Sequence, residues 1–395
     1  MVGVAVVVEP GTVVVVVDEV VVAVVDDSAA VVAAGSVVVD DVVDDGSVLG
    51  ASAASSGAMV DVQPAQRRHP PSSGTMDRAL TATRRYLRPR PKGRRPGQDG
   101  LVHGAEDRLE VTLLGTGSPL PHPERAGPST LVQAGPVRLM IDCGRGSLMR
   151  LAGAGMFPTS LTALLLTHLH SDHVCDFNDL VTTRWVMSPG ESPLIVVGPP
   201  GTRRFVDATL AMLADDIGWR IAHHDDLTSP PSCQVTEIVD GEVDAQLGWS
   251  GTGLRVLVAP TSHRPVHPTI GFRLEYGGAA VAVVGDSLPC DGVDRLTAGA
   301  SIYVQTVVRE VDVRAIPSTR LQDILDYHST TTQAAATAAR AGVGTLVMTH
   351  MVPAPDAASG QFWIDDARAE FTGHVVVGAD LDSFVATPRP RAGGT

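Results

Sequence analysis

The feature that most constrains this chain is a group of three histidines and one aspartate within six positions. The group consists of His168, His170, Asp172 and His173. It follows directly on the apolar run 161–166, which we expect to form a buried strand. Sites on α/β sheets usually lie at the carboxyl ends of such strands. In an extended chain the first two histidines project to one side, and after a turn the other two residues can face back toward them.

Three imidazoles and a carboxylate exceed what a single catalytic zinc ion needs when it keeps one position open for water. They fit two metal ions that share a bridging water. The alternative is a solvated polar turn, since a lone histidine usually has a structural role. Four potential ligands at this spacing, immediately after an apolar strand, favour a metal site.

Polar residues also follow three other predicted strands. Each alone has the ordinary explanation of a polar residue at a strand-to-loop junction. Because they agree with the first group in type and position, we expect them to complete the metal site. They are His263 after the strand at 254–260, Asp286 after the strand at 279–284, and His350 after the strand at 345–348.

Strands are predicted in groups with helices between them, which indicates two sheets faced by helices, an α/β (α+β) fold. The predicted strands are 108–114, 129–134, 137–142, 161–166, 194–197, 254–260, 269–276, 279–284, 302–304, 345–348 and 374–377. The predicted helices are 146–154, 176–187, 201–214, 331–341 and 364–370.

Composition divides the chain into three parts. Residues 1–66 hold ten acids and no lysine or arginine, and valine supplies 25 of the first 62 residues. These runs have high β propensity but few large side chains to fill a core, so we expect a low-complexity, disordered extension. Residues 67–107 are rich in proline and arginine and predict a basic linker, either a solvated tail or a tether for nucleic acid. The globular domain is expected at 108–390.

Several classes of protein are excluded by composition. The first base is Arg67, so no basic region precedes the apolar stretch as in a secretory signal. No uncharged apolar run approaches the roughly 18 residues that a membrane span needs. The four cysteines form no Cys-x-x-Cys pair, which argues against a disulfide framework and a structural cysteine–zinc site. We therefore expect a cytoplasmic protein with reduced thiols and no membrane segment.

From about residue 109 to 386 the chain resembles the metallo-β-lactamase superfamily, in the branch that contains ribonuclease Z and the zinc-dependent arylsulfatases. The matching segments occur in the family's order. They are Gly115-Thr116-Gly117-Ser118-Pro119, His168-Leu169-His170-Ser171-Asp172-His173, His263-Arg264-Pro265-Val266-His267-Pro268 with Gly271-Phe272-Arg273, Gly285-Asp286-Ser287, His328-Ser329-Thr330 and Thr349-His350. The resemblance implies an αββα sandwich with the site at one edge, and a homodimer.

The resemblance also implies two zinc ions per subunit. The ligands it assigns are His168, His170 and His263 for one ion, Asp172, His173 and His350 for the other, and Asp286 as the bridge. It favours His263 over His267, because the spacing before Gly271 matches the family at His263. It places His328 near the metals as a proton donor. The alternative for His328 is a structural or capping role before the helix at 331–341, with Ser329 or Thr330 as N-cap.

The activity implied is cleavage of phosphodiester or sulfate esters by a metal-activated hydroxide, with Asp172 and His328 as catalytic residues. The substrate would be a small anionic ester or an RNA 3′ end. The alternatives are a tRNA 3′-processing endoribonuclease proper and a non-catalytic metal-binding relative. Two departures bear on this choice: the stretch Asp215–Ser232 is short and acidic where the tRNA enzymes carry a long basic arm, and Gln305-Thr306 stands where the family tends to have a His-Glu pair.

Overall fold

The computed structural model describes residues 108–239, 249, 251–356 and 358–389, together with short strands before and between them. The chain divides into two compact units, Met1–Pro96 and Gly97–Thr395. Among the described residues, no helix has the length and apolar character needed to cross a membrane.

The first unit contains an antiparallel sheet of four strands in sequential order. The strands are β1 (Val4–Glu9), β2 (Thr12–Val17), β3 (Val20–Val25) and β4 (Ser28–Ala33). The β-branched valine side chain favours such extended backbone. The expectation of a low-complexity, disordered extension over residues 1–66 stays a prediction. The remainder of that stretch and the predicted linker 67–107 lie outside the described residues.

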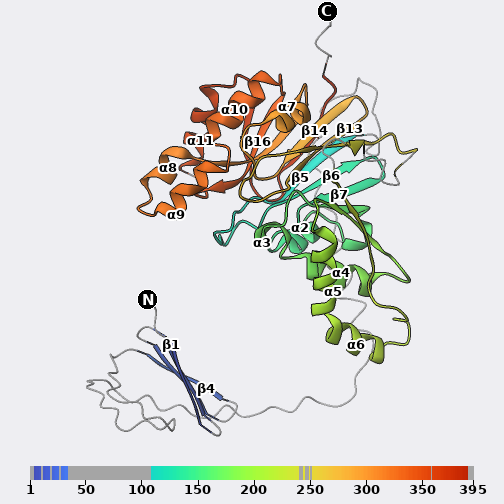
Figure 1. The fold of residues 1–395 in the computed structure, drawn as a ribbon, viewed down its shortest axis with the longest axis vertical. Helices are drawn as coiled ribbons and strands as arrows, with labels where there is room; N and C mark the ends of the chain where they lie inside the picture. The colour runs from blue at the N-terminus through green and yellow to red at the C-terminus, as the bar shows by residue number, and fades with distance from the viewer. Residues whose placement is uncertain are drawn as a thin grey trace, which may run out of the picture. The chain divides into compact units, whose positions relative to one another are not determined.

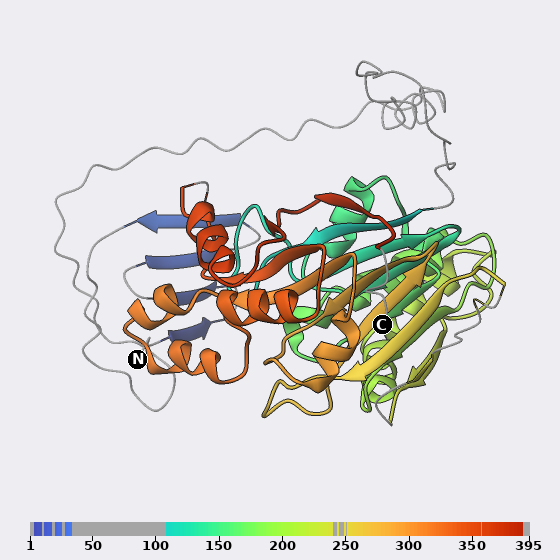
Figure 2. The same cartoon turned by 90° about the horizontal axis from the view of Figure 1, so that it is seen from above.

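The second unit contains two seven-stranded sheets (Figures 1 and 2). The first sheet has the order β10-β9-β8-β7-β6-β5-β18. Its strands are β5 (Leu109–Gly115), β6 (Ser129–Ala134), β7 (Val137–Ile141), β8 (Ala163–Leu165), β9 (Leu194–Gly198), β10 (Cys233–Glu237) and β18 (Ser383–Ala386). Strand β8 lies parallel to both β7 and β9, so the carboxyl ends of these three strands share one edge.

The second sheet has the order β11-β12-β13-β14-β15-β16-β17. Its strands are β11 (Val243–Asp244), β12 (Arg255–Pro260), β13 (Ile270–Tyr276), β14 (Ala279–Val284), β15 (Ile302–Val308), β16 (Thr345–Val352) and β17 (His374–Val377). Strands β14 to β17 are parallel. Strands β14 and β15 are buried along their whole length, as expected for parallel strands covered on both faces.

Helices cover the outer face of each sheet (Figure 1). Those that follow strands of the first sheet are α2 (Ser147–Gly153), α3 (Ser171–Val174), α4 (Phe177–Met187), α5 (Thr202–Met212) and α6 (Ala214–His223). Those that follow strands of the second sheet are α7 (Asp291–Thr297), α8 (Glu310–Ala315), α9 (Thr319–Gln322), α10 (Thr331–Arg340) and α11 (Gly360–Arg368). The short 3-10 turns are η1 (Pro158–Ser160) and η2 (Asp323–Asp326).

Three apolar layers hold this sandwich together. The largest lies between the sheets and includes Val111 and Leu139 from the first and Phe272 from the second. A second layer lies between the second sheet and its helices and includes the buried Trp363 of α11. The third packs Phe177 of α4 against the first sheet. The αββα sandwich expected from the sequence is therefore confirmed.

Most predicted elements of this unit are present within a residue or two of their expected ends. The sequence missed several short or amphipathic elements, among them α3, α6, α7, β10 and β18. Strand β18 pairs antiparallel with β5, although the two strands lie far apart in the sequence, so no local pattern indicates their contact. Helix α3 has only four residues and begins inside the histidine group, too short for a helical period to be visible.

Candidate metal centre

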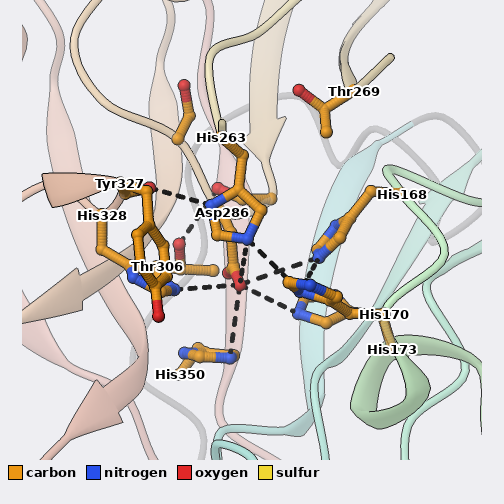
Figure 3. A network of polar contacts seen from close by, with 12 residues as sticks. His168, His170, His173, His263, Thr269, Asp286, Thr306, Tyr327, His328 and His350 are labelled. Atoms are coloured by element: carbon orange, nitrogen blue, oxygen red, sulfur yellow. Dashed lines mark hydrogen bonds and ion pairs between the residues drawn. The ribbon is translucent and has the colours of Figure 1, made fainter. Parts of the chain in front are cut away.

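The predicted site residues come together at the edge where the two sheets meet (Figure 3). Four stretches of chain contribute, and each lies at the carboxyl end of a strand. The segment 168–173 follows β8, His263 follows β12, Asp286 follows β14, and His350 lies near the end of β16. The first sheet therefore supplies one part of the site and the second sheet supplies the rest.

Close approach of two loops explains how this edge closes. Gly285, just before Asp286, lies against Thr167, just before His168. A Cβ atom at Gly285 would lie 2.4 Å from the Oγ1 atom of Thr167, so only glycine allows this contact. The missing side chain thus lets the two ligand-bearing loops touch.

Among the described residues, three groups each have potential ligand atoms within 4.8 Å of one another. Two of them contain the residues that the sequence assigns to the two metal ions, and the third is Asp286, His328 and His350. Of the first two, one is His168, His170, His263 and Asp286, and the other is Asp172, His173 and His350. In the first, Nδ1 of His170 lies 3.1 Å from Nε2 of His168 and 3.3 Å from Nε2 of His263. In the second, Nε2 of His350 lies 3.2 Å from Oδ2 of Asp172.

Asp286 occupies the centre of the site (Figure 3). Five imidazoles from both sheets surround its Oδ2 atom. The distances from their Nε2 atoms are 3.1 Å for His328, 3.5 Å for His173, 3.6 Å for His263, 3.7 Å for His350 and 3.8 Å for His168. The bridging role expected for Asp286 stays a prediction, and its central placement allows it.

Buried polar atoms without partners test whether these residues suit a cation. Within the described chain, Oδ1 of Asp286, Nε2 of His173 and Nδ1 of His350 are buried and form no hydrogen bond. Burying such atoms without a partner is costly. Imidazole nitrogen and carboxylate oxygen are the usual protein ligands of zinc and related divalent metals, so the residues fit a divalent metal centre.

The protonation states also suit ligands. Burial and the neighbouring His173 ring lower the pKa of His168 well below its usual value. Burial lowers the pKa of His263 to about 4, so this ring is neutral at pH 7 and its lone pair is free to bind a metal. Burial alone would raise the pKa of Asp286, but the surrounding histidines lower it well below its usual value. The neutral imidazoles of His168 and His263 thus lie beside an ionised carboxylate.

His173 differs from these rings. Burial would lower its pKa, but Asp286 and Asp142 raise it well above the usual value. The two carboxylates thus draw positive charge to this ring. A cation bound at the centre would supply that charge instead, with Nε2 of His173 as its ligand.

Comparisons with known proteins agree with this geometry. A family model described as a β-lactamase superfamily domain matches residues 137–351. Ribonuclease Z of Mycolicibacterium paratuberculosis is 57% identical over 275 residues, which cover 69% of this chain and 96% of that protein. The chain belongs to the ribonuclease Z family of the β-lactamase superfamily. It is therefore a metal-dependent hydrolase that acts on ester bonds.

Solved structures show the same fold at lower identity. The metallo-β-lactamase fold protein YhfI from Bacillus subtilis has a TM-score of 0.53 and 22% identity, covering 71% of this chain and all of that one (100%). The short form of human tRNase Z has a TM-score of 0.51 and 20% identity, covering 70% of this chain and 98% of that one.

In this member of the ribonuclease Z family, a second layer of residues orients the ligands. Oδ2 of Asp142 accepts hydrogen bonds from Nδ1 of His173 and from Oγ1 of Thr167, each 2.8 Å long. Because the Thr167 hydroxyl donates to Asp142, its oxygen accepts from Nδ1 of His168 at 3.0 Å. Both rings are thereby held with Nε2 on the side of the metal centre, where a bound metal ion would take the place of the Nε2 proton of His173.

Backbone carbonyls orient two further imidazoles. Nδ1 of His263 donates to the carbonyl of Tyr327 at 2.8 Å, and Nδ1 of His328 donates to the carbonyl of Ile324 at 2.9 Å. Both rings therefore point Nε2 toward Asp286 (Figure 3). Burial would lower the pKa of His328, but the charge of Asp286 and its hydrogen bond raise it.

The segment around His328 is fixed by the start of α10. Thr330 is the N-cap of this helix and forms a capping box with Gln333, as the sequence predicted for one of two candidate caps. The Oγ atom of Ser329 donates to the carbonyl of Ser287 at 2.7 Å. This bond ties His328 to the loop that carries Asp286.

The structure also answers two questions left by the sequence. His263 lies in the centre, whereas His267 is exposed outside it. Gln305 and Thr306 lie inside β15, where both side chains donate hydrogen bonds to the carbonyl of Gly285. They therefore support the loop before Asp286.

Three contributors were not predicted: Asp142, Thr167 and the carbonyl of Tyr327. A signal was available for Asp142, since it follows the buried strand β7 in the same way as the ligands follow theirs. Its φ of 59° lies in the left-handed region that non-glycine residues rarely adopt, and His350 has a φ of 50°. Such backbone is often found at functional sites.

Proposed function

We propose that this chain is a binuclear zinc-dependent phosphodiesterase that processes RNA 3′ ends. The observation that carries the proposal is the convergence of seven potential ligands from both sheets, with the carboxylate of Asp286 at their centre. The first zinc would be held by His168, His170 and His263, the second by Asp172, His173 and His350, with Asp286 between them. When bound, such a pair lowers the pKa of water and stabilises negative charge on an ester oxygen.

Two side chains of the protein would take part in the reaction directly. Asp172 lies within 3.6 Å of Nε2 of His173 and 3.2 Å of Nε2 of His350, so its carboxylate faces the reacting centre and can orient the attacking water. His328 is 7% exposed at the rim, and Asp286 favours its protonated form. Its Nε2 proton would pass to the departing oxygen as general acid catalysis.

The RNA substrate is inferred from the relatives. The relative from Mycolicibacterium paratuberculosis carries the name ribonuclease Z at 57% identity, and this similarity covers nearly all of that protein. An RNA phosphodiester near a 3′ end, as in a tRNA precursor, therefore has better support than a sulfate ester. A non-catalytic relative is disfavoured because every predicted ligand is present.

An RNA substrate also needs cationic contacts beyond the metals. Arg203 and Arg204 lie at the start of α5 in an open groove of about 810 Å³. The neighbouring Gly201 lies beside Leu169, which separates the first two histidines of the site, since a Cβ atom at Gly201 would be 3.1 Å from Leu169 Cδ1. The same groove contains Asp207 and Glu237, and Nη2 of Arg203 donates to the carbonyl of Val235 at 2.7 Å. We propose that the remaining donors of the two arginines contact phosphates of the RNA near the metal centre.

The short acidic stretch after α5 limits this binding surface. It forms α6, in which Asp216 accepts a hydrogen bond from Nε of Arg220 at 2.8 Å. Because Arg220 is paired with an acid and further acids lie beside it, α6 is poorly suited to contact a phosphate. We therefore propose that RNA is held from the α5 side, without the long basic arm of the tRNA enzymes.

Metal analysis and three substrates test the proposal. Zinc content is measured on the purified chain, followed by hydrolysis of bis-p-nitrophenyl phosphate, p-nitrophenyl sulfate and a tRNA precursor with a 3′ trailer. We expect two zinc ions per chain, cleavage of the phosphodiester and the precursor, and little action on the sulfate. Cleavage of the sulfate alone would favour an arylsulfatase, and bound zinc with no cleavage of any substrate would favour a non-catalytic protein.

A further inference from the structure

A second groove lies at the end of the second sheet opposite to the metal centre. It encloses about 580 Å³ between the start of β12, the β13–β14 turn, the α7–β15 junction and Arg389 near the C-terminus. The other ends of β12 and β14 lead to His263 and Asp286. The two sites are thus separated by about the length of a six-residue strand, roughly 20 Å.

The charge of this groove contrasts with that of the chain. Its lining contains three arginines, Arg255, Arg273 and Arg389, against the single acid Glu275. In the whole chain, aspartate and glutamate outnumber lysine and arginine by 44 to 30. Guanidinium groups bind phosphate well, because their donors can pair with two phosphate oxygens at once.

Hydrogen bonds fix two of these arginines in place. Glu275 accepts from Nε of Arg273 at 2.7 Å and from Nη1 of Arg255 at 2.9 Å. Nη1 of Arg273 also donates to the carbonyls of Leu296 and Ala298, both at 2.8 Å. The Arg273 side chain is only 12% exposed. A ligand would therefore meet guanidinium groups that are already ordered, which reduces the entropy cost of binding.

The third arginine is brought in by the end of the chain. The Oγ atom of Ser301 donates to the carbonyl of Thr387 at 2.6 Å, and Pro388 lies beside Gly278. Arg389 then lies over Gly344, where an added Cβ atom would be 2.3 Å from its Nη1. The wall of the groove includes the half-buried Tyr276, whose ring offers an aromatic face.

We propose that this groove binds a small phosphate-bearing ligand, with the phosphate held by Arg255, Arg273 and Arg389. The volume is within the range of small-molecule sites, which is about 300–1,000 Å³. A nucleoside phosphate would place its base against Tyr276, whereas free phosphate or pyrophosphate would use the arginines alone. The site is distinct from the metal centre and does not depend on the proposed activity.

Calorimetric titrations of the full metal-loaded chain with AMP, pyrophosphate and inorganic phosphate test the proposal. We expect a binding event that Arg389→Ala weakens about tenfold, and that Arg389→Glu or the Arg255→Ala/Arg389→Ala pair weakens further. Arg368→Ala removes the same charge from the exposed face of α11 and should leave binding unchanged. The event should also weaken as salt is raised.

The source of the phosphate follows from the comparison of the probes. Tighter binding of AMP than of inorganic phosphate identifies a nucleotide site, and equal binding identifies a site for the phosphate group alone. Circular dichroism and the melting temperature of each variant verify that the fold is intact. The metal centre can also attract phosphate, but its binding would persist in the groove variants. The proposal is overturned if every event seen with the wild type is unchanged in Arg389→Glu.

Discussion

Oδ2 of Asp142 lies 2.8 Å from Nδ1 of His173 and holds that ring toward the centre from the side opposite to Asp286. The same oxygen fixes Thr167, which in turn fixes His168. A single carboxylate that is not itself a predicted ligand therefore sets the direction of two imidazoles, one for each proposed zinc ion.

We predict that Asp142→Asn lowers metal affinity and kcat by about 10–100-fold, the range typical for partners of metal-binding histidines. The amide keeps the shape of the side chain but loses its charge. Zinc affinity is measured by competition with a chelator, and kcat with bis-p-nitrophenyl phosphate. Asp179→Asn on the exposed side of α4 is the matched control. Wild-type affinity in Asp142→Asn would show that the hydrogen bonds to His173 and Thr167 do not matter.

Asp172→Ala should abolish measurable turnover. Its carboxylate faces both His173 and His350, so the variant loses a proposed ligand and the group that orients the water. Turnover and zinc content are measured on the same preparation. The control is Asp179→Ala, which removes an exposed acid from the neighbouring helix α4. Substantial turnover by Asp172→Ala would remove this residue from the mechanism.

His328→Ala should lower kcat by about 10²–10⁴-fold and leave the zinc content near two per chain, because we assign the ring to proton donation. The loss of kcat should be smaller for bis-p-nitrophenyl phosphate than for RNA. The p-nitrophenolate that leaves the first substrate needs no proton, whereas the oxygen that leaves RNA does. Comparison of the two substrates separates a proton donor from a residue that only supports the fold. Loss of zinc from this variant would instead identify His328 as a ligand, in keeping with its place beside Asp286 and His350.

Replacing Arg203 and Arg204 with alanine should raise KM for precursor RNA and leave hydrolysis of bis-p-nitrophenyl phosphate unchanged. Each lost phosphate contact should also reduce the slope of log affinity against log salt by about 0.7, the value for single strands. RNA cleavage is measured between low and physiological salt, with Arg368→Ala as control. An unchanged KM and salt slope would place the RNA elsewhere.

Removal of residues 1–100 should leave the fold and the activity on small esters intact. Every residue of the three main apolar layers lies at or beyond Leu109, so the second unit has its own core. Circular dichroism, melting temperature and bis-p-nitrophenyl phosphate hydrolysis are compared with those of the full chain. An unfolded product would show that the extension is needed for stability.

The sequence could predict that the proposed ligands come together because they share one local signal. Each lies at the carboxyl end of an apolar strand, and the carboxyl ends of neighbouring parallel strands meet at one edge. The αββα fold and the preference for His263 over His267 came from the resemblance, and the structure agrees with both. The N-cap of α10 was predicted from a short polar pattern that the capping box explains.

What the sequence did not predict depends on contacts between distant segments. Asp142 is separated from His173 by 31 positions, and nothing local links the two. The carbonyl that orients His263 belongs to Tyr327, and a backbone atom leaves no trace in the sequence.

The proposed ligands come from both halves of the sandwich: His168, His170, Asp172 and His173 follow a strand of the first sheet, whereas His263, Asp286 and His350 belong to the second. Metal loading would therefore join the halves at their open edge as well as equip the enzyme for chemistry. Chelation should then lower the temperature at which the halves separate, in addition to stopping turnover. The amount of bound metal would thus affect the stability of the folded protein as well as its turnover.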